Sequence, residues 1–214
     1  MLKRVLGVFL ACNACFCFAD EKPMTNLMAY TIVLAPEAER SAKYIEVSCS
    51  LCGDHQPSYL LASDGTSSPH ITVVQFRCSE QLAEEVWTRL SQKLQEAGLT
   101  AFEPPFVGVA FVDGAGPYAG TTWVELSVKR GEVDSPIMQM HLVAASVLEE
   151  FGIAPLNACG NNYRPHLTLG RIVMPEQLKT WPQNLLEDTG PFHIEFGMSD
   201  AEWQYALKLG ALTQ

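Results

Sequence analysis

Apolar and polar residues alternate in several short stretches of the chain, and this period of two is typical of β-strands that bury one face. The stretches that predict strands are residues 27–34, 59–61, 69–77, 106–112, 121–128, 164–173, 192–196 and 203–209. Between them apolar residues recur at helical spacing, which predicts helices over residues 36–53, 79–98, 134–151 and 175–186. Short strands interrupted by single helices favour an α+β fold with antiparallel sheet.

Helix ends carry their own signals. Ser79 suits the N-cap of the second predicted helix, and Gly98 suits its stop. We place Pro36 in the first turn of the first helix, where a missing backbone N–H is tolerated. Pro182 must bend or split the last helix.

One short phrase occurs twice, as Pro69-His70-Ile71-Thr72-Val73 and as Pro165-His166-Leu167-Thr168-Leu169. The chain has five histidines, and these two, 96 residues apart, are the ones that follow a proline and precede a threonine by two positions. Side chains at i and i+2 of a strand share a face, so each imidazole projects together with a hydroxyl. A single such phrase means little, whereas two inside apolar strands indicate a shared site.

The order of helix, motif strand, helix and paired strands also occurs twice. We therefore predict an α+β fold with two pseudo-symmetric lobes of antiparallel sheet, flanking helices and a central cleft. The first lobe covers roughly residues 26–112 and the second roughly residues 120–214, together one domain over 20–214. The symmetry would bring His70 and His166 face to face across the cleft.

Composition narrows the class of partner. The hydrophobic content of 48% and charged content of 18% are those of an ordinary globular protein. The net charge is −10 and no basic stripe is present, whereas proteins that hold long nucleic acids neutralise many phosphates with Lys and Arg. An extended nucleic-acid groove is therefore excluded, and a small nucleotide held by a few local charges is compatible with the chain.

Residues 1–19 have the features of a secretory signal peptide. Lys3 and Arg4 precede an uncharged run from Val5 to Phe18 that is too short for a stable membrane span. Cleavage after Ala19 would yield an exported protein, periplasmic or secreted. A lipoprotein signal that uses Cys12 is the alternative, but the residues before Cys12 match that signal poorly.

The mature chain would keep four cysteines, namely Cys49, Cys52, Cys78 and Cys159. Cys49 and Cys52 have the spacing of a redox pair or of half a zinc site, but no second pair completes the set. We interpret the four as core residues or as a structural disulfide, not as catalytic groups.

The doubled phrase resembles the hallmark of the two-histidine (2H) phosphoesterase superfamily. That family includes bacterial RNA 2′,3′-cyclic phosphodiesterases, also called 2′-5′ RNA ligases, and its hallmark is two His-apolar-Thr/Ser-apolar motifs. The resemblance covers about residue 27 to the end, although the segment 35–68 matches nothing transferable and the leader is unusual for RNA-processing members. It implies a two-lobed fold with the active site in the central cleft, and neither a metal nor another cofactor.

The chemistry follows from the residue types. Cleavage of a phosphodiester needs one proton removed from the nucleophile and one delivered to the leaving oxygen, and the pKa of histidine suits both steps. Thr72 and Thr168 would donate hydrogen bonds to the non-bridging oxygens as charge develops there. Family analogy suggests His70 as the acid and His166 as the base.

Other residues are weaker candidates. On a regular strand Arg164 shares the face of His166 and could reach phosphate, whereas Arg171 faces away. Tyr163, or Tyr30, could stack on a base. Each is also explained as a solvated charge or a buried aromatic residue. We interpret the two remaining histidines near the C-terminal half as structural: His141 and His193.

The function predicted from these residues is hydrolysis of a small phosphodiester by a monomer without metal, the best fit being a nucleoside or oligonucleotide 2′,3′-cyclic phosphate. Three alternatives stay open. One is cleavage or ligation of 2′-5′-linked oligonucleotides, and another is a module that binds nucleotide phosphates without turnover. The third, a metal-dependent hydrolase, needs a further ligand, and no Asp or Glu accompanies the motifs at fixed spacing.

Overall fold

The computed structural model describes residues 26–62, 67–173, 186 and 190–212 of the 214-residue chain. The predicted leader over residues 1–19 lies outside the described residues. So does the helix predicted at 175–186, except for its last residue.

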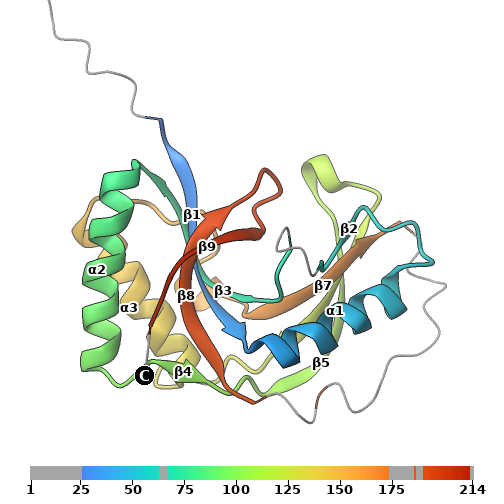
Figure 1. The fold of residues 1–214 in the computed structure, drawn as a ribbon, viewed down its shortest axis with the longest axis horizontal. Helices are drawn as coiled ribbons and strands as arrows, with labels where there is room; N and C mark the ends of the chain where they lie inside the picture. The colour runs from blue at the N-terminus through green and yellow to red at the C-terminus, as the bar shows by residue number, and fades with distance from the viewer. Residues whose placement is uncertain (1–25, 63–66, 174–185, 187–189, 213–214) are drawn as a thin grey trace, which may run out of the picture.

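Nine strands and three helices make up the described part of the chain (Figure 1). The strands are β1 (Met28–Pro36), β2 (Tyr59–Leu60), β3 (Ile71–Cys78), β4 (Ala101–Phe102), β5 (Phe106–Asp113), β6 (Thr122–Val128), β7 (His166–Ile172), β8 (Phe192–Ser199) and β9 (Tyr205–Ala211). The helices are α1 (Ala38–Cys52), α2 (Glu80–Glu96) and α3 (Pro136–Glu150), and two short 3-10 turns lie at Gly116–Tyr118 and Gly160–Asn162.

The strands form one antiparallel sheet with the order β4-β8-β1-β3-β7-β6-β5. Off this path, β2 pairs with β7 and β9 pairs with β8. Antiparallel neighbours of this kind need no helical crossover between them, which is why the helices are few. The predicted α+β class with antiparallel sheet is confirmed.

The strand pairings cross the boundary drawn from the sequence between residues 26–112 and 120–214. Figure 1 shows the C-terminal strands β8 and β9 in red beside β1 in blue, within the half of the sheet that holds the first motif. Conversely, β5 pairs with β6 in the half that holds the second motif. Periodicity predicts where strands lie, but it does not specify their partners, which depend on register and packing.

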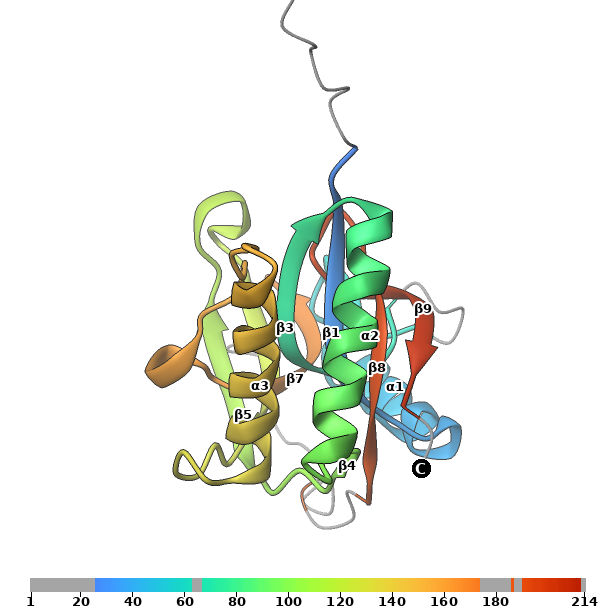
Figure 2. The same ribbon diagram turned by 90° about the vertical axis from the view of Figure 1, so that its left-hand side faces the viewer.

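The helices cover the two halves of the sheet differently. Figure 2 shows α2 and α3 side by side over the half with β1, β3 and β8, and α3 packs against β3. Helix α1 packs against β7 instead. The helix that precedes each motif strand in the sequence thus supports the motif strand of the other half.

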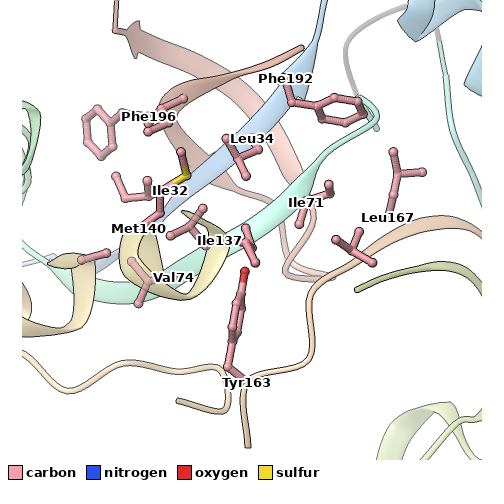
Figure 3. Close-up of a cluster of buried hydrophobic side chains, with 14 of the residues drawn as sticks. Ile32, Leu34, Ile71, Val74, Ile137, Met140, Tyr163, Leu167, Phe192 and Phe196 are labelled. Carbon is pink, nitrogen blue, oxygen red and sulfur yellow. The ribbon is translucent and has the colours of Figure 1, made fainter. Parts of the chain in front are cut away.

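The core passes without interruption between the two halves. Ile71 of β3 and Leu167 of β7 pair directly and have no exposed surface (Figure 3). On the side of β1, Ile32 and Leu34 are buried and join the same cluster, as does Phe192 of β8. Burial of this apolar surface stabilises the junction on which both motifs stand.

Two predicted helix ends are confirmed and one is wrong. The Ser79 hydroxyl accepts a hydrogen bond from Leu82 N at 3.4 Å, and Gly98 follows α2 with φ +68°. Pro36, however, is the last residue of β1, where it pairs with Phe192, and α1 begins at Ala38. A proline tolerates a strand end as well as a first helical turn, so the sequence did not separate the two.

No disulfide joins cysteines within the described residues, and Cys52 and Cys78 are buried. Burial, with a smaller contribution from Cys49, raises the pKa of the Cys52 thiol to about 12. A thiol in this state is a poor nucleophile. Of the helices in the described ranges, none is long and apolar enough to cross a membrane.

Candidate active site

The two motif strands meet at their N-terminal ends. Among the described residues β3 and β7 pair at Ile71 and Leu167. Continuing the antiparallel count by one residue on each side brings His70 opposite Thr168, and Thr72 opposite His166. The four side chains predicted from the doubled motif therefore lie on one face, where they line a common pocket.

The pocket has a volume of about 300 Å³, at the small end of the range for ligand sites. Its wall combines both motif strands with the α3–β7 connection and the turn between β8 and β9, and none of the described lining residues is acidic. They are His70, Thr72, Gln75, Asn157, Ala158, Asn162, Tyr163, Arg164, His166, Thr168, Trp203 and Gln204. In a chain with net charge −10, this is a local environment that suits an anion.

Both histidines are held in the same way. His70 Nδ1 lies 2.8 Å from Ser68 O, and His166 Nδ1 lies 2.9 Å from Arg164 O. A carbonyl oxygen can only accept, so Nδ1 carries the hydrogen in each ring. Nε2 is then a proton acceptor in the neutral ring and a donor in the protonated ring.

The proline of each motif explains this geometry. It stands between the histidine and the residue whose carbonyl holds the ring, and a residue before proline is restricted to extended conformations. The carbonyls of Ser68 and Arg164 are thereby fixed two residues before the imidazoles that they bind. The phrase Pro-His selects the tautomer as well as the position of the histidine.

The two histidines differ in burial. His70 is 6% exposed, and the ring of Tyr205 meets it edge-on with 5.7 Å between ring centroids. Burial lowers the pKa of His70 to about 4, with a smaller contribution in the same direction from His166, while the hydrogen bond to Ser68 opposes the shift. His70 is therefore neutral near pH 7, with the Nε2 lone pair free to accept a proton.

His166 is more open and stands beside a buried carboxylate that the sequence did not indicate. Its side chain is 31% exposed, and Nε2 lies 3.5 Å from Oε1 of Glu125, which is 5% exposed. Arg164 Nη1 approaches Glu125 Oε2 to 2.7 Å, but not with the alignment of a hydrogen bond. Arg164 therefore lies in the pocket wall as predicted, with its charge partly compensated by Glu125.

Tyr163 lies in the pocket wall but cannot serve as a base platform. Its ring is 3% exposed and stacks on His141 at 3.9 Å with an interplanar angle of 1°. Its hydroxyl donates to Thr72 O at 2.8 Å and points toward β3 (Figure 3). The ring is thus fixed behind the first motif, and Tyr30, which stacks on Phe76 and Phe196, belongs to the core.

Each motif strand contains a β-bulge directly after its threonine. In β3 the bulge is at Val73: Val33 of β1 pairs with Thr72 and Ile32 of β1 pairs with Val74, so Val73 has no partner on β1. In β7 the bulge is at Leu169, which has no partner on β6 although its neighbours Thr168 and Gly170 are both paired there. A bulge reverses the alternation of faces along its strand.

The bulges bring the fifth residue after each histidine to the pocket side of the sheet. These residues are Gln75, which lines the pocket, and Arg171, which pairs with Trp123 on the face of Glu125 and His166. The prediction that Arg171 faces away assumed a regular strand and is wrong for this reason. The adjacent apolar residues Val73 and Val74 break strict alternation in the first strand, and Gly170 inside the second strand is a common mark of a bulge.

The unpaired bulge carbonyls are satisfied by the helices behind the sheet. Val73 O accepts a hydrogen bond from His141 Nδ1 at 2.9 Å, and Leu169 O accepts one from Ser48 Oγ of α1. His141 Nε2 in turn accepts from Gly160 N at 3.0 Å, so this buried ring is neutral with both nitrogens satisfied. His141 is structural, as predicted, and His193 lies outside the pocket beside Glu37.

Several residues in or beside the pocket were missed by sequence reasoning because they reach the site from loops or from a neighbouring strand. Glu125 depends on the register of β6, while Asn157, Trp203 and Gln204 come from loops that the motifs do not mark. Within the described residues, no group of three His, Cys, Asp or Glu side chains lies close enough to hold a metal ion.

Comparison with known proteins gives one family and one fold. The family model described as the 2′-5′ RNA ligase superfamily matches residues 53–200, which include both motifs. A solved phosphoesterase structure shares 16% identity over 87% of this chain and 99% of its own, with a TM-score of 0.52.

Two structures of E. coli LigT are similar to the same extent. The complex with 3′-AMP shows 17% identity over 88% of this chain and 99% of its own, with a TM-score of 0.51. The complex with NADP+ shows 15% identity, the same two coverages and a TM-score of 0.51. At these identities the likeness shows a shared fold, and a search of curated protein sequences found no match.

Proposed function

Since the chain belongs to the 2′-5′ RNA ligase superfamily of two-histidine phosphoesterases, as the doubled motif predicted, we propose that it hydrolyses nucleoside or oligonucleotide 2′,3′-cyclic phosphates without a metal. Family membership supports phosphodiesterase-type activity. The finer assignment is carried by one observation: two imidazoles, each with Nδ1 held by a carbonyl, line one pocket without acidic lining residues.

The burial of the two rings suggests their roles. His70 is neutral at working pH, so its Nε2 takes the proton from the attacking water. His166 delivers the second proton to the ribose oxygen that leaves. The water oxygen forms a bond to phosphorus, one ester bond of the ring breaks, and a nucleoside monophosphate results. This assignment is the reverse of the one suggested by family analogy.

The remaining polar groups stabilise charge on the phosphate. The hydroxyls of Thr72 and Thr168 donate to the non-bridging oxygens, where negative charge increases in the transition state. Arg164 contributes a guanidinium whose partner, Glu125, lies beneath the pocket and does not line it. A compact pocket of about 300 Å³ favours a terminal nucleotide over a long strand. LigT, which shares the fold, has been captured with 3′-AMP.

A second reaction uses the same groups. Joining or cleaving a 2′-5′ phosphodiester requires the same two proton transfers at a ribose hydroxyl, and the family description names this activity. The family match therefore favours 2′-5′-linked oligonucleotides as the alternative substrate. A module that binds nucleotide phosphates without turnover is the alternative outside enzymology.

The experiment is hydrolysis of the four 2′,3′-cyclic nucleotides in the presence of EDTA by the wild type and by the His70→Ala and His166→Ala variants. We expect turnover by the wild type and a loss of roughly 10²- to 10⁴-fold in either variant. Activity that EDTA abolishes would instead indicate a metal-dependent hydrolase. If all three proteins bind nucleoside monophosphates but none turns over a cyclic nucleotide or a 2′-5′ dinucleotide, the protein is a binding module.

A further inference from the structure

The turn between β8 and β9, residues 200–204, forms one side of the pocket and is held rigidly by its own backbone. Asp200 Oδ1 accepts hydrogen bonds from Glu202 N at 2.8 Å and from Gln204 N at 2.9 Å. Trp203 N donates to Asp200 O at 3.1 Å, and Asp200 N donates to Gln204 O at 2.9 Å. These four bonds fix the turn in one conformation.

The conformation that they fix is an unfavourable one for Trp203. Its φ is +64°, in the left-handed region that glycine and asparagine occupy more readily than a bulky aromatic residue. Such strain persists where surrounding contacts over-determine the backbone, and it concentrates at functional sites. A glycine would relieve the strain here but would remove the indole ring from the pocket wall.

Both motif strands reach this turn through the residues that the bulges redirect. Gln75 Nε2 donates to Trp203 O at 2.5 Å and to Ser199 Oγ at 3.4 Å. Arg171 Nη1 donates to Glu202 Oε2 at 2.7 Å. The fifth residue after each histidine thus ties the turn to the strand that carries that histidine, so the position of the indole is coupled to the positions of both imidazoles.

One face of the indole is already covered by a cation. The Arg77 guanidinium carbon lies 4.5 Å from the Trp203 ring centroid. The side chain of Trp203 is half-buried and belongs to the pocket wall beside Gln204. Within the described part of the chain no aromatic ring stacks on the indole of Trp203. Trp87, by contrast, stacks on Phe196 at 5.4 Å and packs on the core.

We propose that Trp203 is the platform on which the nucleobase of the substrate stacks, and that Gln75 and Arg171 position it. This inference rests on the proposed function, and it makes the substrate a phosphodiester that carries a base. A base–indole–guanidinium stack would use the ring face opposite Arg77 and would accept any base, because every base offers a π-face. Binding would therefore require a base without strong preference among the four.

The test compares a substrate with a base and one without. Trp203→Leu keeps apolar bulk and removes the ring, Trp203→Phe keeps an aromatic face, and Trp87→Phe is the matched control outside the pocket. KM and kcat are measured with 2′,3′-cyclic AMP and with ribose 2′,3′-cyclic phosphate. We expect Trp203→Leu to raise KM for cyclic AMP by about 5- to 150-fold, the range for loss of one base stack.

The same variant should leave KM for the baseless substrate within about twofold, whereas Trp203→Phe should retain most of the affinity for cyclic AMP. Equal effects on both substrates, or no effect on either, would overturn the proposal. Should Trp203→Leu fail to fold in circular dichroism, Gln75→Ala, which frees the Trp203 carbonyl, should selectively raise KM for cyclic AMP.

A binding measurement separates this proposal from the catalytic one. Calorimetric titration of His166→Ala with 3′-AMP and with ribose 3-phosphate needs no turnover. If no cyclic nucleotide is hydrolysed but Trp203→Leu in this background still weakens 3′-AMP selectively, the hydrolase assignment fails and the platform stands. If cyclic nucleotides are hydrolysed but Trp203→Leu leaves the affinities for 3′-AMP and ribose 3-phosphate unchanged, the platform proposal is refuted and the hydrolase assignment stands.

Discussion

At the scale of single residues, the two halves of the site have the same motif but differ in how deeply the imidazole is buried. Each imidazole is held through Nδ1 by a carbonyl two residues earlier, so the difference comes from what packs around the ring. His70 is covered by Tyr205, whereas His166 opens to solvent beside Glu125. In the proposed mechanism the covered ring of His70 acts as the base and the open ring of His166 acts as the acid.

Removing the cover should change the pH at which His70 works. Tyr205→Ala lets water reach the ring, so the pKa of His70 should rise from about 4 toward the ordinary value. The acid limb of kcat/KM, which reports the free enzyme, should then move from near pH 4 to higher pH.

Tyr205→Phe is the matched control, because it keeps the ring edge against His70 and loses the bond from the Tyr205 hydroxyl to Glu195 Oε2. Its acid limb should stay with that of the wild type. Coincident profiles for the Ala and Phe variants would show that this ring does not set the proton affinity of His70.

A second prediction concerns the ion pair beneath the second motif. In the wild type Arg164 Nη1 lies 2.7 Å from Glu125 Oε2. Arg164→Ala removes this guanidinium, so the buried Glu125 carboxylate is left uncompensated and repels a bound phosphate. We expect kcat/KM to fall by about tenfold or more, and the Glu125→Gln change to restore part of the loss in the double variant. Additive effects of the two changes on kcat/KM would mean that the pair is not coupled to catalysis.

At this scale the sequence predicted the residues whose placement depends on one strand, and it missed those whose placement depends on a neighbouring strand. The period of two placed His70 with Thr72, and His166 with Thr168, on one face of each strand, because it depends on local geometry alone. Glu125 could not be found in that way, since its approach to His166 follows from the register between β6 and β7.

At the scale of elements, the bulges are the feature that separates these strands from the regular ones expected. Each bulge turns the fifth residue after the histidine toward the pocket, and each leaves a carbonyl to be satisfied by a helix. Strand and helix positions were largely predictable, because a buried face imposes a period. The reversal of faces was not, because a bulge depends on partner strands far away in the sequence.

Ser48 offers a direct test of how a bulge is supported. Its hydroxyl donates to Leu169 O and accepts from Leu61 N at 3.0 Å, so Ser48→Ala leaves two buried backbone groups unsatisfied. We expect the free energy of unfolding in urea to fall by about 2 kcal/mol. Ser91→Ala on α2 is the matched control, because the Ser91 hydroxyl is buried and has no hydrogen-bond partner in the described chain.

The control should change stability by less than about 0.5 kcal/mol. A Ser48 variant as stable as the Ser91 variant would show that the bulge carbonyl finds another donor. Activity should fall with the Ser48 change even at temperatures where the variant stays folded, since the bulge directs Arg171 toward the turn.

At the scale of the whole molecule, burial of His70 links stability to pH. The unfolded chain takes up a proton near pH 6.5, but the folded protein does so near pH 4. Because the pKa of His70 is lower in the folded protein, the contribution of neutral His70 to the free energy of unfolding is fully present above pH 6.5 and is lost as the pH falls toward 4. The loss amounts to about 3 kcal/mol in the free energy of unfolding.

His70→Asn removes this titration. Urea unfolding of both proteins is measured between pH 7.5 and pH 4. As the pH falls, the free energy of unfolding of the wild type should decrease relative to that of the variant by about 3 kcal/mol in total. Stability curves that stay parallel over this range would contradict a neutral buried His70.

The leader calls for a test of the intact chain. We propose export with cleavage after Ala19, so mass spectrometry of the protein expressed from Met1 should find Asp20 at the N-terminus in the periplasmic or secreted fraction. The chain started at Asp20 should stay in the cytosol. An intact Met1 in the cytosol would rule this leader out.

The pairing of β1 with β8 also governs when the site can form. These strands lie near opposite ends of the chain, and β8 and β9 carry the 200–204 turn and the Tyr205 ring that covers His70. Contacts between distant segments form slowly and late, because their loop-closure entropy must be overcome first. A growing chain therefore has neither the ring that covers His70 nor the turn that forms one side of the pocket until β8 and β9 are made, so the pocket is completed only after most of the chain has been synthesised.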